Sequence, residues 1–231
     1  MSNYKSSEEV REEHLSKMGP ELGAVFYELS NGVTGLHIKW KQYVELYGTK
    51  PERIELLNEA ASLFFSVVQQ VLWDDTLLHL TRLTDPPRSF GKPNLTLRLL
   101  PPLIDNDIVR STVEALINDA CKRTGFARDW RNRRIAHSDL QLALEEKARP
   151  LEHASRQQVR EALAAVDAVL NSVSEHFFDF TTRFDLVSYS QGDAGSLLYV
   201  IRDGLKVEHQ RLIWAEEGGL DPDDLLGGGE I

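Results

Sequence analysis

A short basic stretch near the middle of the chain carries the residue types that RNA cleavage requires. It reads Trp130-Arg131-Asn132-Arg133-Arg134-Ile135-Ala136-His137-Ser138-Asp139. RNA supplies its own nucleophile, the 2′-hydroxyl, so a cleaving protein needs a group that moves protons and a cation beside the phosphate. Histidine, with an unperturbed pKa of about 6.5, accepts or donates a proton near neutral pH. Arginine presents a planar fork of donors that suits phosphate oxygens.

The residues of this stretch have distinct expected roles. We assign proton transfer to His137 and the phosphate contact to Arg131. Asn132 would position the phosphate or the imidazole, and Asp139 would orient the imidazole if the helix has ended before it. Three further cations would supply supporting positive charge: Arg128, Arg133 and Arg134. The sequence has no His-Glu-x-x-His motif and no Cys/His cluster, so we expect neither a metal nor a cofactor.

The spacing of Arg131 and His137 does not suit one regular helix. At about 100° per residue, positions six apart lie about 120° apart around the helix axis. Either the helix ends before His137, or a second protomer completes the site. In a dimer, Arg131 of one chain would act on a phosphate near His137 of the other. The alternative to catalysis is that these side chains stabilise a helix C-terminus through its dipole.

The basic stretch contrasts with the charge of the whole chain. The net charge is −10 over 231 residues, which argues against non-specific coating of nucleic acid. Between residues 122 and 134, six basic residues accompany one acid, Asp129, so one phosphate group can still be held there. The single cysteine, Cys121, excludes an internal disulfide. No apolar run approaches the ~18 residues of a membrane span, and we expect a soluble, cytoplasmic protein without membrane association.

Apolar residues recur at helical spacing along most of the chain and predict an all-α fold. One stripe runs from Leu22 to Tyr47, and a longer, more apolar segment covers residues 52–83. A helix that is apolar nearly all round is central in a bundle. Shorter helices are expected over residues 95–100 and from about 126 to 137. The short connections favour antiparallel neighbours in a single helical bundle with additional flanking helices.

Cap residues mark three more helices. We expect Asp105, Ser155 and Asp193 to cap the helices that follow them. Apolar residues from Val159 to Phe180 keep a 4-3 spacing over three heptads, which favours antiparallel packing within a bundle over a separate coiled-coil dimer. The helices after Asp105 and Asp193 are expected to turn further apolar residues inwards, among them Ile108, Leu197, Leu198 and Leu212.

The domain organisation predicted from these patterns has three parts. Residues 1–19 form an N-terminal helix or arm, and residues 20–215 form one helical domain. Residues 216–231 contain six acids, no base and a Gly-Gly-Gly run. We expect this acidic tail to be disordered.

The end of the long apolar segment carries charged residues among leucines. Asp75 and Arg82 are seven residues apart and share a helix face, and Asp85 lies three residues beyond Arg82. One interpretation is a structural ion pair. The other makes these three residues the wall of a polar site, supporting the side chains that contact the substrate.

Several of these segments resemble the abortive-infection, AbiU-type branch of the HEPN superfamily (higher eukaryotes and prokaryotes nucleotide-binding). The Arg-Asn-x4-His pattern from Arg131 to His137 resembles the Arg-polar-x-His signature of that superfamily. The other similar segments are Leu80-Thr81-Arg82-Leu83-Thr84-Asp85, Asn94-Leu95-Thr96-Leu97, Ile135-Ala136-His137-Ser138-Asp139 and Gly192-Asp193. The similar region covers residues 20–215.

The resemblance implies a helical bundle, often dimeric, with two motifs facing each other across a cleft. Many HEPN members are metal-independent ribonucleases of toxin–antitoxin, phage-defence and RNA-processing systems. The resemblance assigns Arg131 and His137 to the catalytic pair of the family and Asn132 to the polar second position of its motif. We therefore expect an endoribonuclease of defence or toxin type, a homodimer acting on RNA, with an antitoxin among its candidate partners. The alternative is a non-catalytic helical module that binds a nucleotide or a protein partner.

Overall fold

The computed structural model describes residues 5–89, 91–137, 139–144, 149–186 and 192–218. In these residues the regular secondary structure is helical apart from one two-stranded hairpin, which confirms the all-α prediction. The chain divides into two compact units, described separately below. The first spans Met1–Lys41 and Val71–Val187, and the second spans Gln42–Gln70 and Ser188–Ile231. No helix in the described ranges is both long and apolar enough to cross a membrane.

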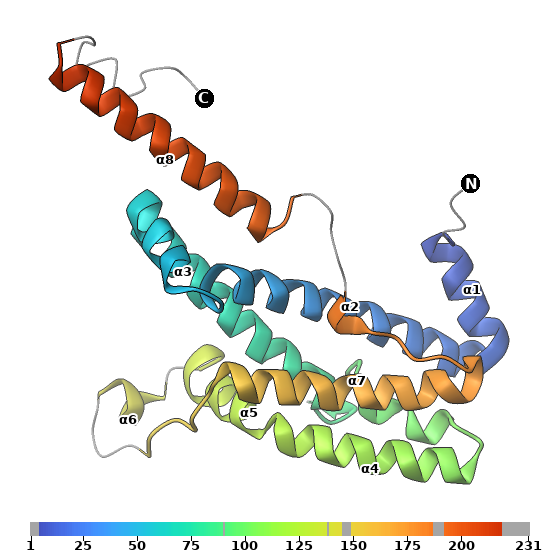
Figure 1. The fold of residues 1–231 in the computed structure, drawn as a ribbon. Coiled ribbons are helices and arrows are strands. Elements are labelled where there is room, and N and C mark those ends of the chain that lie inside the picture. Colours follow the sequence, from blue (N-terminus) through green and yellow to red (C-terminus); the bar gives the residue numbers. More distant parts are fainter. Residues whose placement is uncertain (1–4, 90, 138, 145–148, 187–191, 219–231) are drawn as a thin grey trace. The chain divides into compact units, whose positions relative to one another are not determined.

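Helices α1 (Ser7–Met18) and α2 (Pro20–Tyr47) open the described chain (Figure 1). A capping box starts α1, because the Ser6 hydroxyl accepts from the Glu9 N–H while the Glu9 carboxylate accepts from the Ser6 N–H. The apolar stripe predicted in α2 is confirmed, since its members in the first unit are buried: Leu22, Phe26, Leu29, Val33, Leu36 and Trp40.

Helix α3 (Pro51–Thr84) is interrupted at Ala61, where φ is −165° and ψ is 73°. In the first unit, its C-terminal part packs antiparallel to α2 (Figure 1). Three contacts establish this direction: Trp40 with Trp73, Lys39 with Asp75, and Gly32 with His79. The residue numbers fall along α2 as they rise along α3, so each turn back along α2 matches a turn forward along α3.

The prediction that the whole apolar segment lies at the centre of a bundle is wrong for part of α3. Leu77, Leu80 and Leu83 are buried in the first unit. Four earlier apolar side chains are more than half exposed: Leu63, Phe64, Val67 and Val71. The spacing of apolar residues predicts a helix, but it does not show which other element covers each face of that helix.

A small hairpin follows α3, ahead of the segment in which a short helix is predicted. Strand β1 (Arg88–Ser89) pairs antiparallel with β2 (Lys92–Pro93). The Asn94 amide nitrogen donates to the Pro86 carbonyl at 2.9 Å and to the Ser89 hydroxyl at 2.7 Å, so Asn94 closes the hairpin. The predicted helix over residues 95–100 is wrong. Two 3-10 turns, η1 (Leu97–Leu99) and η2 (Pro101–Leu103), occupy this part of the chain.

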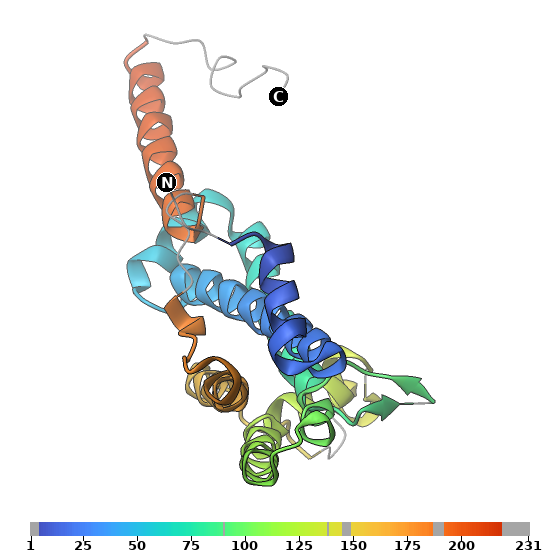
Figure 2. The same ribbon diagram turned by 90° about the vertical axis from the view of Figure 1, so that its right-hand side faces the viewer.

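Helices α4 (Asp107–Arg123) and α7 (Arg156–Phe178) lie side by side in both views (Figures 1 and 2). The Ser155 cap is confirmed as a capping box with Gln158. The cap of α4 is Asn106, whose side chain accepts from two backbone N–H groups, and not Asp105 as predicted. Ile108 is 80% exposed, against the prediction that it faces inwards. Ile108 is five residues from buried Val113, so the two lie about 140° apart around the helix axis.

The heptad seam of α7 is confirmed as far as Val173, and the next member, Phe177, is half-buried. Its members are buried: Val159, Leu163, Val166, Leu170 and Val173. Asp179 has a left-handed backbone, with φ 58°, and caps the C-terminus. Phe180 therefore lies beyond the helix and is exposed, so the predicted seam extends too far. The 3-10 turn η4 (Phe184–Leu186) follows.

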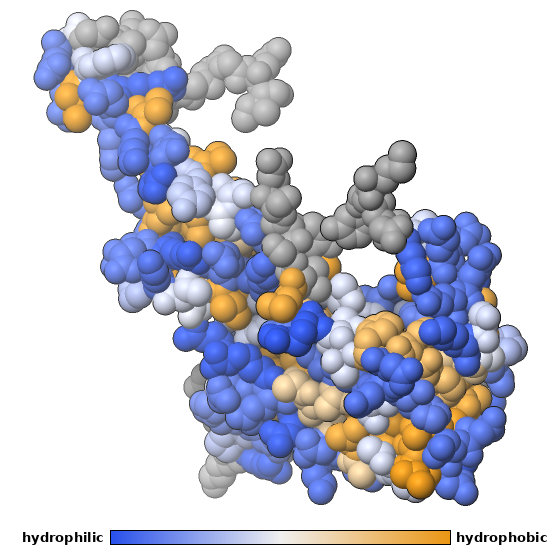
Figure 3. Space-filling view, turned by 45° about the vertical axis from the view of Figure 1, so that its right-hand side comes forward, coloured by the Kyte–Doolittle hydropathy of each residue, from blue (hydrophilic) through white to orange (hydrophobic). Residues whose placement is uncertain are grey.

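In the second unit, α8 (Ala194–Glu216) starts at the predicted cap, Asp193, whose carboxylate accepts from the Ser196 N–H at 3.0 Å. The predicted inward face is only partly buried: Leu198 is buried, whereas Leu197 and Leu212 are exposed. Apolar residues are visible among hydrophilic ones along α8 in Figure 3. From residue 219 onwards the predicted acidic tail lies outside the described residues.

Candidate functional site

The basic stretch adopts an unusual helical turn. Helix α5 (Gly125–Trp130) ends where the stretch begins, and a π-helical turn, η3 (Arg131–Ile135), follows. The Ala136 N–H donates to the Arg131 carbonyl at 2.8 Å, five residues back. Such turns are rare in proteins, and those that occur often lie at functional sites. The continuous helix predicted to His137 is therefore wrong: the helix ends before His137, which is the first of the two alternatives that the spacing left open.

Arg131 faces α3 and pairs with the last acidic residue of that region. Its Nη1 donates to Asp85 Oδ2 at 2.5 Å, and its Nε donates to Asn132 Oδ1 at 3.0 Å. The Arg131 and Asp85 side chains are 24% and 18% exposed. Partial burial shields the pair from solvent, so the carboxylate fixes the direction of the guanidinium. These bonds use two of the five donors of the arginine.

A second arginine and two buried threonines lie behind this ion pair. Arg128 Nη2 donates to the Thr84 hydroxyl at 2.9 Å, and Arg128 Nε lies 3.8 Å from Asp85 Oδ1. The hydroxyl oxygens of Thr84 and Thr124 are 2.9 Å apart, and both residues are fully buried. Asp85 is thus held between two arginines. Neither threonine was predicted to belong to the site. The available signal for Thr84 was its place next to Asp85 in the segment Leu80-Thr81-Arg82-Leu83-Thr84-Asp85.

Arg133 points away from this cluster and binds the segment after α6 (Leu140–Ala143). Its Nη2 donates to the Arg149 carbonyl at 2.5 Å and its Nη1 to the Pro150 carbonyl at 3.3 Å. Two carboxylates also lie within 4 Å of its guanidinium, those of Asp129 and Asp139. The guanidinium of Arg133 therefore donates its hydrogen bonds to groups of the protein itself. Its partners lie on both sides of residues 145–148, which are outside the described residues.

Asp139 caps α6, because its carboxylate accepts from the Leu142 N–H at 3.0 Å. This hydrogen bond, helped by the charge of Arg133, holds the pKa of Asp139 below its usual value. The predicted orientation of the His137 imidazole by Asp139 stays a prediction. Ser138, between the two, lies outside the described residues.

Trp130 fixes the start of the π-helical turn. Its Nε1 donates to the Glu152 carbonyl at 2.8 Å, and its ring makes an edge contact with Trp73, 6.4 Å between centroids. The Arg134 guanidinium lies 5.1 Å from the Trp130 ring centroid. Four described residues of the stretch are exposed to solvent: Asn132, Arg134, Ala136 and His137. The stretch is thus anchored on one side by Trp130 and Arg131 and open on the other.

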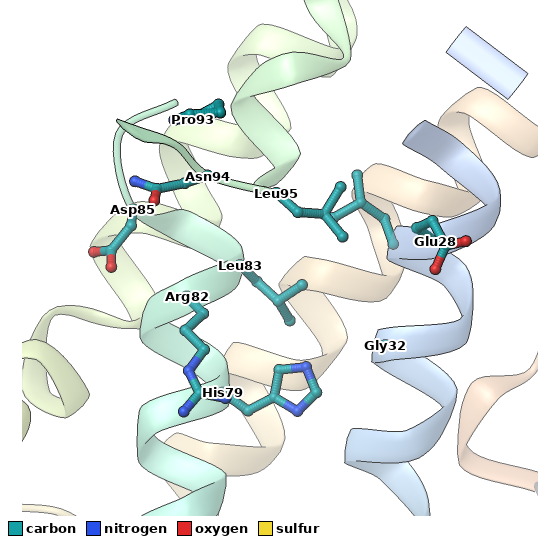
Figure 4. Close-up of a pocket in the computed structure, with 10 residues that line it drawn as sticks. Glu28, Gly32, His79, Arg82, Leu83, Asp85, Pro93, Asn94 and Leu95 are labelled. Atoms are coloured by element: carbon teal, nitrogen blue, oxygen red, sulfur yellow. The ribbon is translucent and has the colours of Figure 1, made fainter. Parts of the chain in front are cut away.

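A cavity of about 390 Å³ lies in the first unit between α2, the C-terminal part of α3 and the hairpin (Figure 4). Its polar lining includes Asp85, the partner of Arg131, together with Arg82 and His79 from α3. Of the predicted charged wall, Arg82 and Asp85 therefore lie at one cavity. Asp75 does not line it and forms an ion pair with Lys39.

His79 is an uncharged wall of this cavity at neutral pH. Burial, followed by the nearby charge of Lys39, lowers the pKa of His79 to about 4. The unfolded chain, with a histidine pKa of about 6.5, binds the proton more readily than the folded protein. The contribution of His79 to stability is therefore complete above pH 6.5 and is lost as the pH falls from 6.5 towards 4.

We expect wild type to lose about 3 kcal/mol of unfolding free energy more than His79→Gln between pH 7 and pH 4. The glutamine does not titrate, so the difference between the two proteins isolates His79. Urea unfolding followed by circular dichroism at several pH values measures it. Parallel pH curves for the two proteins would show that His79 is not buried as described.

In the described ranges, no group of three or more His, Cys, Asp and Glu residues is arranged to hold a metal ion. A model of the family HEPN_AbiU2, described as AbiU2, matches residues 19–197. The chain belongs to the HEPN AbiU2 family. Comparisons of this HEPN AbiU2 chain with curated proteins and with solved structures found no match. The Arg131–Asp85 pair, the π-helical turn and the cavity all lie within the matched residues.

Proposed function

We propose that this HEPN AbiU2 protein is a metal-independent endoribonuclease of a phage-defence or toxin type. Arg131 would bind the scissile phosphate and His137 would transfer protons. The observation that carries this proposal is that Asp85 orients Arg131 at the start of the π-helical turn, while His137 is exposed two residues beyond the turn's end. An oriented cation and an exposed imidazole, six positions apart in the chain, are the two groups that this reaction would use.

The reaction needs only groups that the chain and the RNA provide. The 2′-oxygen attacks phosphorus, the bond to the 5′-oxygen breaks, and the products carry a 2′,3′-cyclic phosphate and a 5′-hydroxyl. One proton leaves the 2′-hydroxyl and one reaches the departing 5′-oxygen, and imidazole is suited to either transfer near neutral pH. A guanidinium at the phosphate offsets the negative charge that grows on the equatorial oxygens.

The charges around Arg131 favour this role. Two arginines, Arg128 and Arg131, flank the single carboxylate of Asp85. The cluster therefore keeps one net positive charge after the ion pair has formed. Exposed Arg134 adds another cation on the same stretch, and exposed Asn132 can donate to a phosphate oxygen. A single phosphate is thus attracted locally, even though the whole chain is acidic.

The first test compares RNA with DNA of the same sequence in the presence of EDTA. RNA should be cut, and DNA should stay intact because it lacks the 2′-hydroxyl. Cleavage that stops on chelation, or equal cleavage of both polymers, would contradict the mechanism. If the RNA also stays intact, the function is that of a non-catalytic module that binds a nucleotide or a protein partner.

We also propose a homodimer in which two motifs complete each other. His137 and Arg134 are exposed, so the open side of the stretch is accessible to a second copy and to RNA. Light scattering should then give a mass near twice 26.2 kDa. A mass near 26.2 kDa at working concentration would contradict the dimer.

Mixed dimers test which chain supplies each group. If Arg131 acts with His137 of the partner chain, co-refolded Arg131→Ala and His137→Ala proteins form heterodimers with one intact site. Activity should then return to about a quarter of wild type, because half of the dimers are mixed and each has one of two sites. No recovery, with mixed dimers shown by native mass spectrometry, would place both groups of each site on one chain.

A further inference from the structure

The cavity beside Asp85 carries two side chains of opposite charge on facing helices. Gly32 of α2 meets His79 of α3, whose Nε2 lies 3.5 Å from the position that a Cβ would take at Gly32. Because the helices are antiparallel here, one turn back along α2 reaches Glu28 and nearly one turn forward along α3 reaches Arg82. Glu28 from α2 and Arg82 from α3 both line the cavity (Figure 4).

Neither charge is used elsewhere in the described part of the chain. Glu28 and Arg82 form no hydrogen bond or ion pair there, and both are exposed to solvent. This distinguishes them from Asp75, which is paired with Lys39, and from Asp85, which is paired with Arg131. A ligand in the cavity can thus accept from Arg82 and donate to Glu28 without breaking an existing bond.

The remaining walls suit the faces of a planar ring. Leu29, Leu83 and Leu95 line the cavity, and Figure 4 shows Leu83 and Leu95 between α3 and α2. His79 adds an uncharged imidazole at neutral pH, since its pKa is lowered to about 4. The volume of about 390 Å³ is that of a small-ligand site. Apolar walls with a few polar groups are typical of such sites.

We propose that this cavity binds a guanine base of the RNA. Guanine is the common base that presents two adjacent donors, N1–H and the N2 amino group, beside two adjacent acceptors, O6 and N7. Glu28 would accept from the two donors, and Arg82 would donate to O6 and N7, the commonest specific contact of arginine with a base. Adenine, cytosine and uracil each lack at least one of these two edges.

The position of Asp85 connects this base to the cleavage site. Asp85 lines the cavity and also accepts from Arg131. Its side chain lies at one edge of the lining and points away from the His79 imidazole (Figure 4). A guanine in the cavity would then lie next to the phosphate at Arg131. This linkage rests on the proposed nuclease function, whereas binding of guanine in the cavity does not.

Binding of mononucleotides to the His137→Ala protein tests the cavity without cleavage. GMP should bind more tightly than IMP, which lacks the N2 amino group, and than 7-deaza-GMP, which lacks N7. Each lost contact should weaken binding by about 5- to 150-fold. Glu28→Ala should remove the preference for GMP over IMP, and Arg82→Met should remove the preference for GMP over its 7-deaza analogue. Isothermal titration calorimetry measures all of these affinities.

A cavity-filling pair provides the matched control. Gly32 lines the cavity, whereas a Cβ at Gly35, one turn away on the same helix, would meet no atom within 4 Å. Gly32→Leu should abolish GMP binding, and Gly35→Leu should preserve it. Thermal unfolding checks that both variants fold. If Gly32→Leu does not fold, the Glu28→Ala and Arg82→Met affinities decide.

The outcomes separate this inference from the proposed function. GMP binding with the expected discrimination supports the guanine site even if no RNA is cut, in which case the nuclease proposal alone fails. RNA cleavage by wild type, with equal affinities for GMP, IMP and AMP or with none, overturns the guanine site and leaves the nuclease proposal standing. Discrimination that survives both Glu28→Ala and Arg82→Met also overturns it.

Discussion

His137→Ala is expected to lower kcat for RNA cleavage by about 10²- to 10⁴-fold, the usual contribution of a positioned acid or base. The side chain is exposed and lies beyond the last residue of the π-helical turn, so its removal should not disturb packing. The loss should therefore appear in kcat, while the unfolding free energy stays within about 0.5 kcal/mol of wild type. Single-turnover cleavage of a labelled RNA and urea unfolding measure the two quantities.

His176→Ala is the matched control for this substitution. His176 is also exposed, but it lies in α7 and outside the basic stretch. Its replacement should leave the cleavage rate unchanged. Equal rates for wild type and His137→Ala would show that His137 transfers no proton in the rate-limiting step, and the assignment would have to be abandoned.

Replacing Asp85 by asparagine should separate orientation from charge. Asp85 holds Arg131 and lies close to Arg128, so Asp85→Asn releases the guanidinium and raises the local positive charge by one. The rate constant kcat should fall by about 10- to 100-fold because the oriented cation is lost. KM for RNA should stay equal or fall, since phosphate attraction increases. If the role of Asp85 were only structural, Asp85→Asn would raise KM or unfold the protein instead.

A double-mutant cycle measures the coupling of this pair. Arg131→Gln should lower kcat by about 10²- to 10³-fold, comparable to the loss of one donor to a developing oxyanion. Adding Asp85→Asn to Arg131→Gln should cost little more, because the carboxylate acts through that arginine. Losses that multiply fully would show that Asp85 and Arg131 act independently, which the 2.5 Å contact between them does not predict.

Local patterns of the sequence predict much of the fold. The buried stripe of α2, the seam of α7 and the caps Ser155 and Asp193 depend on residues within a few turns of each other. The prediction of buried residues fails where burial depends on which other element covers a helix face. Exposed Phe64 and Val67 have the same helical spacing as buried residues, and spacing does not reveal what covers them.

The candidate site also has features that the local sequence predicts and others that depend on distant residues. Residue types and spacing single out the basic stretch, and Asp85 is included in the predicted polar wall. The sequence does not show that Asp85 meets Arg131, because the two are 46 positions apart. Nor does residue type alone distinguish Arg131 from Arg133, which has the same chemistry but binds backbone carbonyls. The π-helical turn is invisible to a search that assumes 3.6 residues per turn.

The chemistry of the RNA ends tests the central claim most directly. Wild-type protein would be incubated with a defined RNA in EDTA, and the fragments identified by mass spectrometry. The mechanism through Arg131 and His137 predicts fragments with a 2′,3′-cyclic phosphate and a 5′-hydroxyl, and none of them with His137→Ala. Fragments with a 5′-phosphate, or equal fragments from wild type and His137→Ala, would contradict the mechanism.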